Sequence, residues 1–245
     1  MLRKGAETFV ELPPLSCGGI YGAAAIGVDE SDSTLGQVLL LGGHHQTNFG
    51  ISSMRLVDLA TGVCTPQAAL LHTRSYFAAA GLPDGRVVCA GGLGIQTTAE
   101  MWGPPSQGAH QDAAWTWSQL PPMSVGRQGC IGCVLSDGRF AVIGGRNNSG
   151  ITSSCEMLSF GGDGDWQPLP PMQNSRSHFV HVVVAGCIIV AGGVARGVAG
   201  GVAGGGGAPH RRSAEVFDEV LGRWLRLPCD LPHAGGLVYM GSALL

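Results

Sequence analysis

The sequence has few charged residues and no excess of either sign. Of its 245 residues, 13% are Asp, Glu, Lys or Arg, and the net charge is −3. Proteins that bind nucleic acid through its phosphates carry a basic stripe, and this sequence has none, so nucleic acid is excluded as the expected partner. With 44% hydrophobic residues, the chain is also too apolar to be disordered and can fill a core.

Long apolar runs are absent as well. The most apolar stretch, Val180 to Val190, is interrupted by His181 and Gly186, and it is too short to cross a membrane. The start of the chain, Met1 to Pro14, lacks the apolar segment of a secretory signal peptide. These features predict a cytoplasmic protein with no membrane partner.

Motifs for metal binding and catalysis are also missing. The eight cysteines do not indicate a disulfide scaffold in a chain of this length. Cys89, Cys130, Cys133 and Cys187 lie in apolar runs and are interpreted as buried thiols. Cys130 and Cys133 have no second ligand pair at zinc spacing, and neither a nucleophile elbow nor a phosphate-binding glycine loop is present. We expect no catalytic residue, no metal site and no cofactor.

Glycine, in contrast, is abundant, with 41 residues, and it marks an internal repeat. An apolar run ending in two glycines occurs four times, and the second glycine falls at residues 43, 92, 145 and 193. The units are therefore 49, 53 and 48 residues apart. A period of this size is typical of stacked or radial repeats of one supersecondary unit.

Three other features recur with the same period as the glycine pairs. An arginine precedes three of the pairs, an acidic residue with an apolar neighbour follows them, and a tryptophan comes next, with a cysteine at that place in the first unit. These residues are Arg74, Arg127 and Arg176, then Glu100, Glu156 and Glu215, then Trp117, Trp166 and Trp224, with Cys64 in the first unit. Because they recur in each unit, we interpret them as structural. The tryptophans are expected to pack between units, and the arginines to hold contacts between units or to cover apolar surface with their stems.

The glycine pair, the acidic–apolar pair, the tryptophan and the period together resemble the kelch motif. The resemblance covers the chain from Phe9 onward and implies an all-β protein, a single kelch-type β-propeller domain over residues 1–245. Four complete four-stranded blades are expected at about 15–70, 71–123, 124–172 and 173–231, with 1–14 and 232–245 supplying terminal strands of a partial fifth. The count leaves open a fragment of a larger propeller, a small five-bladed ring, and closure with another chain.

The second unit shows how a blade is expected to form. Residues 76–82 and 86–90 are predicted as the first two strands, joined by a turn at Asp84-Gly85, where glycine adopts positive φ easily. Residues 97–102 and 116–120 are predicted as the third and outer strands. The glycine pair is expected where the backbone passes a neighbouring blade too closely for a Cβ atom.

The loops after the glycine pairs differ most between units, which is typical of recognition loops on a rigid scaffold. His44 and His45 follow the first pair, and Arg146 and Asn148 follow the third. The Arg146–Ser149 loop is similar to a substrate-contacting loop of kelch-type ubiquitin-ligase adaptors, in which arginine and asparagine grip acidic or polar peptide groups. The BTB and BACK domains of those adaptors are missing from this sequence. These four residues are the predicted contact residues for a protein or peptide partner.

The resulting functional prediction is a non-catalytic protein–protein interaction scaffold, a substrate-recognition propeller of a larger complex with a ubiquitin-ligase component among its partners. Two alternatives stay open. One is a copper-radical oxidase, the catalytic class among kelch propellers, which uses two tyrosines, two histidines and a cysteine; no such set can be carried over to this sequence. The other is a non-functional fragment of a longer kelch protein. Fold alone does not decide between these functions.

Overall fold

The computed structural model describes residues 20–28, 36–45, 50–94, 96–105, 114–161, 164–195 and 212–228, and in these ranges the protein is all-β. Eighteen strands form four antiparallel four-stranded sheets and one two-stranded hairpin. This part of the chain contains no helix long and apolar enough to cross a membrane.

The four sheets follow one another along the chain as blades. Blade 1 contains β1 (Ala24–Val28), β2 (Gln37–Leu41), β3 (Met54–Asp58) and β4 (Cys64–Gln67), and blade 2 contains β5 (Ala78–Gly81), β6 (Val87–Ala90), β7 (Ala99–Gly103) and β8 (Thr116–Leu120). Blade 3 contains β9 (Ile131–Val134), β10 (Phe140–Ile143), β13 (Cys155–Leu158) and β14 (Trp166–Leu169), with the hairpin β11 (Arg146–Asn147) and β12 (Gly150–Ile151). Blade 4 contains β15 (Val180–Val184), β16 (Cys187–Ala191), β17 (Ala214–Asp218) and β18 (Arg223–Arg226).

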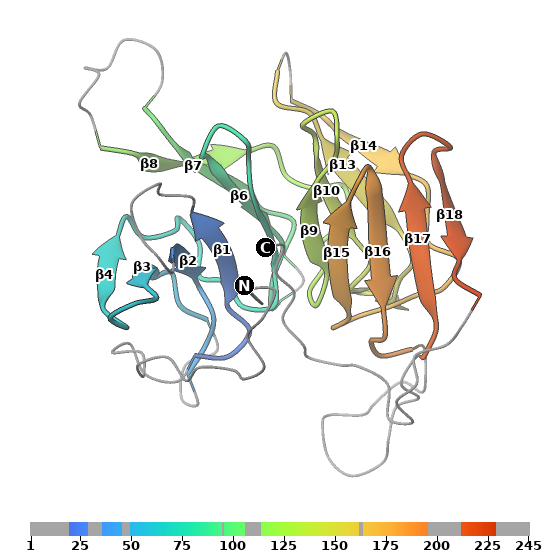
Figure 1. Cartoon of the computed structure of the whole chain (residues 1–245), viewed down its shortest axis with the longest axis horizontal. Coiled ribbons are helices and arrows are strands. Elements are labelled where there is room, and N and C mark those ends of the chain that lie inside the picture. Colours follow the sequence, from blue (N-terminus) through green and yellow to red (C-terminus); the bar gives the residue numbers. More distant parts are fainter. Residues whose placement is uncertain are drawn as a thin grey trace, which may run out of the picture.

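The blades are arranged as a β-propeller, as Figure 1 shows. The first strand of each blade is the inner one, and β1 lies against β5, β5 against β9, and β9 against β15. No comparable packing joins β15 to β1 among the described strands. The predicted all-β propeller with four complete blades is confirmed. The predicted partial fifth blade, residues 1–14 and 232–245, lies outside the described residues, and the predicted blade boundaries stay predictions.

The inner strand of blade 2 is shorter than predicted. The expected strand over 76–82 is reduced to β5, because Tyr76 has φ 56° and cannot continue an extended strand. At the other end, Leu82 already belongs to the hairpin turn, where its N–H donates to the Arg86 carbonyl at 2.7 Å. The second and third strands, β6 and β7, also begin later than predicted, at Val87 and Ala99.

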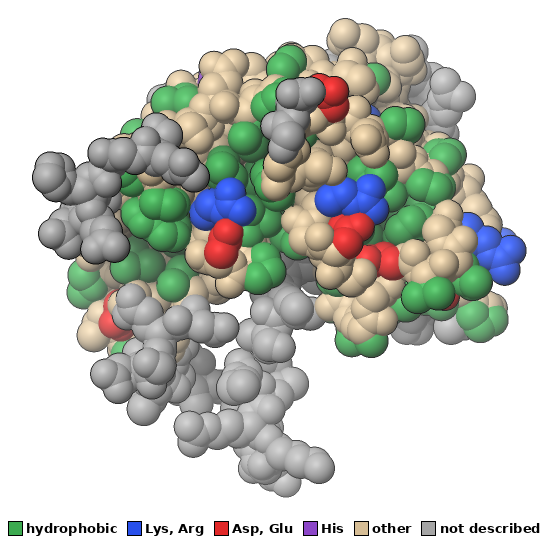
Figure 2. Space-filling model, turned by 90° about the horizontal axis from the view of Figure 1, so that it is seen from above, with side chains coloured by type: hydrophobic (Ala, Val, Ile, Leu, Met, Phe, Trp, Pro, Cys, Tyr) green, Lys and Arg blue, Asp and Glu red, His purple; other side chains and the backbone are tan. Residues whose placement is uncertain are grey.

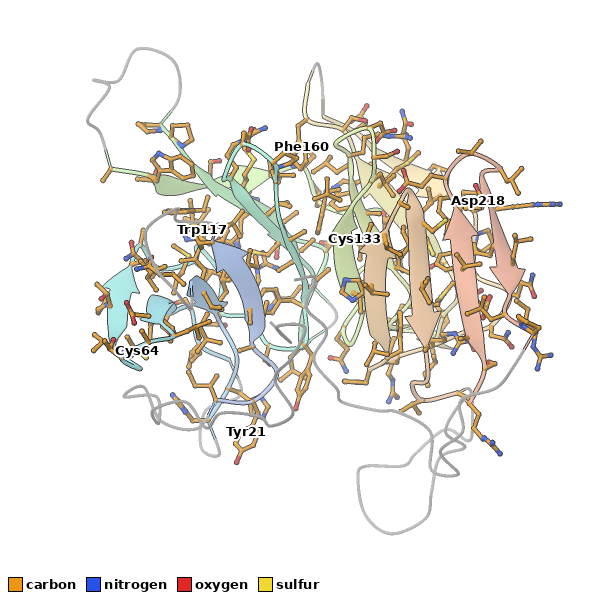
Figure 3. The ribbon with its side chains drawn as sticks, in the orientation of Figure 1. Tyr21, Cys64, Trp117, Cys133, Phe160 and Asp218 are labelled. Carbon is orange, nitrogen blue, oxygen red and sulfur yellow. The ribbon has the colours of Figure 1, made fainter. Side chains whose placement is uncertain are left out.

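The tryptophans lie between adjacent blades, as predicted. Trp117, labelled in Figure 3, is buried against Leu39 and Leu41 of blade 1. Each repeated tryptophan also donates its indole N–H to a carbonyl of the preceding blade's outer segment. The acceptors are Ala68 for Trp117 (2.9 Å), Pro121 for Trp166 (2.7 Å) and Pro170 for Trp224 (2.8 Å). A large apolar surface and one directed hydrogen bond therefore fix each joint.

The glycine pairs lie where neighbouring backbones pass closely, which confirms the steric prediction. Gly42 has φ 56°, and a Cβ atom there would stand 2.6 Å from the carbonyl oxygen of Arg74, on the chain that leads into blade 2. Gly43, with φ 98°, donates its N–H to the same oxygen at 2.7 Å. Any larger residue at Gly42 would combine an unfavourable φ with a clash.

The repeated arginines are buried and form ion pairs inside their own blades. Arg74 donates to Glu100 at 2.7 Å, and the equivalent pairs are Arg127–Glu156 at 2.8 Å and Arg176–Glu215 at 2.9 Å. The guanidinium groups also bond to backbone carbonyls, as Arg127 does to Gly144 and Ser154. The side chains of these arginines therefore bond within one blade, and the expected contacts between blades run through the arginine backbone. The arginines join blades through their backbone carbonyls, which accept from the second glycine of the preceding blade.

Candidate partner-binding site

The loops after the glycine pairs gather at one end of the propeller, which we call the mouth. In Figure 3 the mouth is the lower end, marked by Tyr21, and Phe160 marks the opposite end. Each blade contributes two pieces to the mouth. One is the segment that enters its inner strand, and the other is the residue that follows its glycine pair, as in the antiparallel bridges Tyr21–His44 and Gln128–Arg146.

A belt of backbone hydrogen bonds runs around the mouth. One residue of each entering segment adopts left-handed backbone geometry, namely Gly22 (φ 63°), Tyr76 (φ 56°), Gly129 (φ 61°) and His178 (φ 53°). The last three donate their N–H groups to the carbonyl of the counterpart in the preceding blade, from Tyr76 to Gly22 at 2.8 Å, from Gly129 to Tyr76 at 2.7 Å and from His178 to Gly129 at 2.9 Å. The belt explains why every blade adopts this geometry whatever residue stands there.

Glycine suits this position, but two blades place large side chains on it. A left-handed non-glycine residue costs about 1–2 kcal/mol. The ring of Tyr76 lies over Gly22, where a Cβ atom would come within 2.9 Å of two ring atoms, and His178 lies over Gly129, with Cε1 at 2.6 Å from such a Cβ. Strained residues of this kind concentrate at binding and catalytic sites, so Tyr76 and His178 mark the mouth as the candidate site.

Four aromatic rings form a row along the belt. Ring centroids are 5.6 Å apart from Tyr21 to His44, 5.3 Å from His44 to Tyr76, and 5.2 Å from Tyr76 to His178. Tyr21 is 52% exposed, and the other three rings are partly buried. His44 keeps one ring nitrogen, Nδ1, buried without a hydrogen-bond partner among the described residues. The row offers a partner an apolar surface with a few polar edges.

Arg146 lies near the His178 end of this row. It is exposed, and its backbone is held by two hydrogen bonds with Gln128, of 2.8 and 3.0 Å. Burial and, secondarily, the positive charge of Arg146 lower the pKa of His178 to about 4, so His178 is neutral at physiological pH. No carboxylate of the described residues forms an ion pair with Arg146.

At the opposite end of the propeller, two arginines form ion pairs with neighbouring carboxylates. Figure 2 views this end, where blue and red side chains lie side by side at two places. Arg86 contacts Asp84 at 2.7 Å and Arg139 contacts Asp137 at 2.6 Å, and the bond from Arg139 lowers the pKa of Asp137. These four residues line an open groove of about 380 Å³ with Phe160. Because both arginines of the groove are already paired, the groove has less to offer an anionic partner.

The structure brings two of the four predicted contact residues to the row of rings. His44 lies within the row, and Arg146 lies near its end. His45 is partly buried beside His44. Asn148 is exposed in the turn between β11 and β12, away from the bridge that holds Arg146. The assignment of these residues to a partner site stays a prediction.

Sequence reasoning missed Tyr21, Tyr76 and His178. A signal was present, since the position two residues after the repeated arginine is tyrosine in blade 2, glycine in blade 3 and histidine in blade 4. Alternation between glycine and a large residue at one repeat position indicates left-handed geometry that some blades keep without glycine. Only the structure shows that the two large side chains lie in one row with His44.

Acid is expected to weaken the fold through His178. Its folded pKa of about 4 lies below the ordinary value near 6.5, so the unfolded chain binds more protons between these two values. The free energy of unfolding should therefore fall as pH drops from about 6.5 to about 4, and should not change above that window through this group. Burial gives His181 a pKa of about 4 as well. Urea unfolding at several pH values should show that the free energy of unfolding depends less on pH in His178→Gln than in the unchanged protein. An equal pH dependence would contradict the low pKa of His178.

The chain was compared with known proteins both in sequence and in structure. No family model matches it. Over 79 residues, which are 32% of this chain, it is 34% identical to Kelch-like protein 40 of Mus musculus. The chain is a kelch-repeat β-propeller. The aligned part is only 12% of the length of Kelch-like protein 40, so the whole protein's properties do not carry over directly.

Solved structures agree on the propeller fold. The structure of YjhT matches with a TM-score of 0.64 and 14% identity, over 93% of this chain and 70% of that one. A fungal alcohol oxidase of the AA5 family, solved in complex with copper, matches with a TM-score of 0.52 and 13% identity, over 89% of this kelch propeller and 55% of the oxidase. At these identities the likeness shows the fold alone.

Proposed function

We propose that this kelch propeller is a non-catalytic protein-interaction scaffold that binds a partner at the mouth. The observation that carries the proposal is the row of Tyr21, His44, Tyr76 and His178 with the exposed Arg146 beside it. Two of these residues keep a strained backbone that glycine would relieve. A structural role alone does not require large side chains there, because blades 1 and 3 form the same belt with glycine.

The chemistry of the mouth favours a peptide segment with an acidic or polar group next to an apolar one. The guanidinium of Arg146 can form paired hydrogen bonds with a carboxylate. The rings beside it can pack against an apolar or planar side chain while their polar edges accept or donate hydrogen bonds. Residues of these types dominate the energetics of protein interfaces.

Replacing Tyr76 or His178 with glycine should separate binding from folding. Glycine removes the ring and suits the left-handed backbone, so thermal stability should change little, since lost packing is offset by relief of about 1–2 kcal/mol of strain. Partner recovery should fall about tenfold or more, as expected for a central contact. Arg146→Ala should have the same effect on recovery. The measurement is quantitative mass spectrometry of proteins retained by the immobilised propeller.

The matched control is Arg86→Ala, which removes a partly exposed arginine at the opposite end. It should leave the retained proteins unchanged. The proposal fails if Tyr76→Gly, His178→Gly and Arg146→Ala retain the same proteins in the same amounts as the unchanged chain, or if Arg86→Ala removes them equally.

Two narrower statements belong to the same proposal. One is that the partner is a substrate presented to a ubiquitin ligase in the cytoplasm, which predicts that Arg146→Ala lengthens the partner's cellular half-life. The other is that the propeller has no catalytic activity. Within the described residues, no three side chains of His, Cys, Asp and Glu cluster as metal ligands, which favours binding over copper-dependent oxidation. Stoichiometric copper in the purified protein, together with alcohol oxidation, would support the oxidase alternative instead.

A further inference from the structure

The charged side chains of the propeller divide between its two ends. Each blade turns from its first strand into its second, and from its third into its outer strand, at the end opposite the mouth. Six of the nine carboxylates among the described residues lie at these turns, namely Asp58, Asp84, Asp137, Asp165, Asp218 and Glu219. Figure 3 labels Asp218 at this end, far from Tyr21. Three arginines accompany them, Arg86, Arg139 and Arg223, so the described residues give the opposite end a net negative charge.

The mouth end carries the opposite charge. The other three carboxylates of the described residues, Glu100, Glu156 and Glu215, are buried, and each forms an ion pair with an arginine. Outside these neutral pairs, the described charged residues of the mouth half are all arginines, namely Arg55, Arg146, Arg212 and Arg226. Arg146 and Arg212 are exposed. The mouth is therefore a cationic surface, on which none of the described carboxylates outside the buried pairs opposes an acidic partner.

The sequence between the described strands keeps the same division of charge. Outside the described ranges, the residues between β1 and β2, β7 and β8, and β13 and β14 include no lysine or arginine, but five carboxylates, Asp29, Glu30, Asp32, Asp112 and Asp163. Residues 196–211, which follow the fourth glycine pair, include Arg196 and Arg211 and no carboxylate. The sign of the charge thus follows the place in the repeat rather than the blade, so the division is a property of the repeat as a whole.

A separation of charge of this kind acts on a partner before any contact forms. The fields of exposed charges reach about 8 Å at physiological ionic strength and further in low salt. Such fields raise the association rate of a partner of the opposite charge by about 10- to 1000-fold, and like charges suppress wrong partners. The cationic mouth therefore attracts an acidic segment and repels a basic one, while the net negative charge of the opposite end repels the acidic segment.

We propose that the partner presents an acidic segment, and that the separation of charge steers this segment to the mouth. The proposal rests on the proposed function, and it goes further because it selects an acidic segment over one that is only polar. It also gives Arg212, which lies outside the row of rings, a role in association. Charges at the rim of an interface change the association rate, whereas buried charge contacts change the dissociation rate.

Two synthetic peptides test the charge of the segment. One is a short flexible peptide of Glu, Leu and Ser, and the other has Lys in place of each Glu. Surface plasmon resonance with the immobilised full chain should show binding of the Glu peptide, with an association rate that falls about tenfold from low to physiological salt. The Lys peptide should bind about tenfold more weakly or less. Arg146→Glu should remove the preference for the Glu peptide, because it places a like charge at the mouth.

Two arginines of blade 4 provide a matched pair of variants. Arg212 lies at the mouth end and Arg223 at the opposite end, and both are exposed. Arg212→Gln should slow association of the Glu peptide about two- to threefold in low salt and leave its dissociation rate unchanged. Arg223→Gln removes the same charge and should not slow association.

Four results would overturn the acidic segment. They are equal binding of the two peptides, no binding of the Glu peptide, an association rate that does not depend on salt, and equal slowing in Arg212→Gln and Arg223→Gln. The proposed function is tested separately, because it depends on the proteins lost from Tyr76→Gly and His178→Gly, whatever the charge of the segment. Loss of those proteins without a preference for the Glu peptide would therefore overturn the acidic segment alone.

Discussion

Glu156→Ala is expected to lower the free energy of unfolding by about 3–5 kcal/mol, because it leaves a buried guanidinium without its countercharge. Arg127 is 1% exposed, and Glu156 is the carboxylate that it contacts, at 2.8 Å. Glu156 also accepts hydrogen bonds from the backbone N–H and hydroxyl of Ser124, at 2.9 and 2.7 Å. Removing Glu156 therefore breaks the contact between the third strand of blade 3 and the segment that leads into that blade. Urea unfolding followed by circular dichroism measures the loss.

Two comparisons make this prediction specific. Arg139 and Asp137 form a pair of similar length, but both side chains are partly exposed, so Asp137→Ala should cost less than about 1 kcal/mol. The double variant Arg127→Met with Glu156→Leu removes both charges and should be more stable than Glu156→Ala alone. A loss in Glu156→Ala no larger than that in Asp137→Ala would show that the buried pair does not hold the blade.

The repeated features made the fold predictable from sequence. Gly42, Gly91 and Gly144 mark close backbone approaches between blades, and that steric demand recurs at each joint, so the residues recur too. The tryptophans are predictable for the same reason. The ion pairs of the arginines could not be predicted, since the sequence places Arg127 and Glu156 in one blade but does not show that their side chains meet.

The candidate site was predictable only in part, because it depends on what differs between blades. His44 and Arg146 follow glycine pairs and could be nominated from their place in the repeat. Tyr76 and His178 stand where other blades have glycine, which hints at left-handed backbone, but only the structure shows that their rings point into one row. The distance between rings from three different blades cannot be read from spacing along the chain.

Blade 1 departs from the repeat in a way that the sequence shows but does not explain. It has Ile20 where the other blades have arginine, Arg55 where they have glutamate, and Cys64 where they have tryptophan. At the other joints the indole is the side chain that bonds to the preceding blade, and among the described strands no blade packs on that side of blade 1.

Trp117→Ala should destabilise the protein by about 3–5 kcal/mol, comparable to the loss of a buried charge partner, because it opens a cavity at the joint between blades 1 and 2. Trp117 is 7% exposed, and it packs with Leu39, Leu41 and Val87 in one cluster. Thermal unfolding followed by calorimetry should show a lower midpoint and, if the joint opens first, a broader transition.

Trp117→Phe distinguishes packing from hydrogen bonding at this joint. Phenylalanine keeps much of the apolar surface but loses the N–H that donates to Ala68 at 2.9 Å. That bond is worth about 0.5–1.5 kcal/mol, so Trp117→Phe should recover most of the stability that Trp117→Ala loses. Equal losses in the two variants would show that the directed hydrogen bond, rather than apolar burial, holds the two blades together. In that case the cysteine at the same position of blade 1 would matter because it lacks the indole hydrogen bond, more than because it buries less apolar surface.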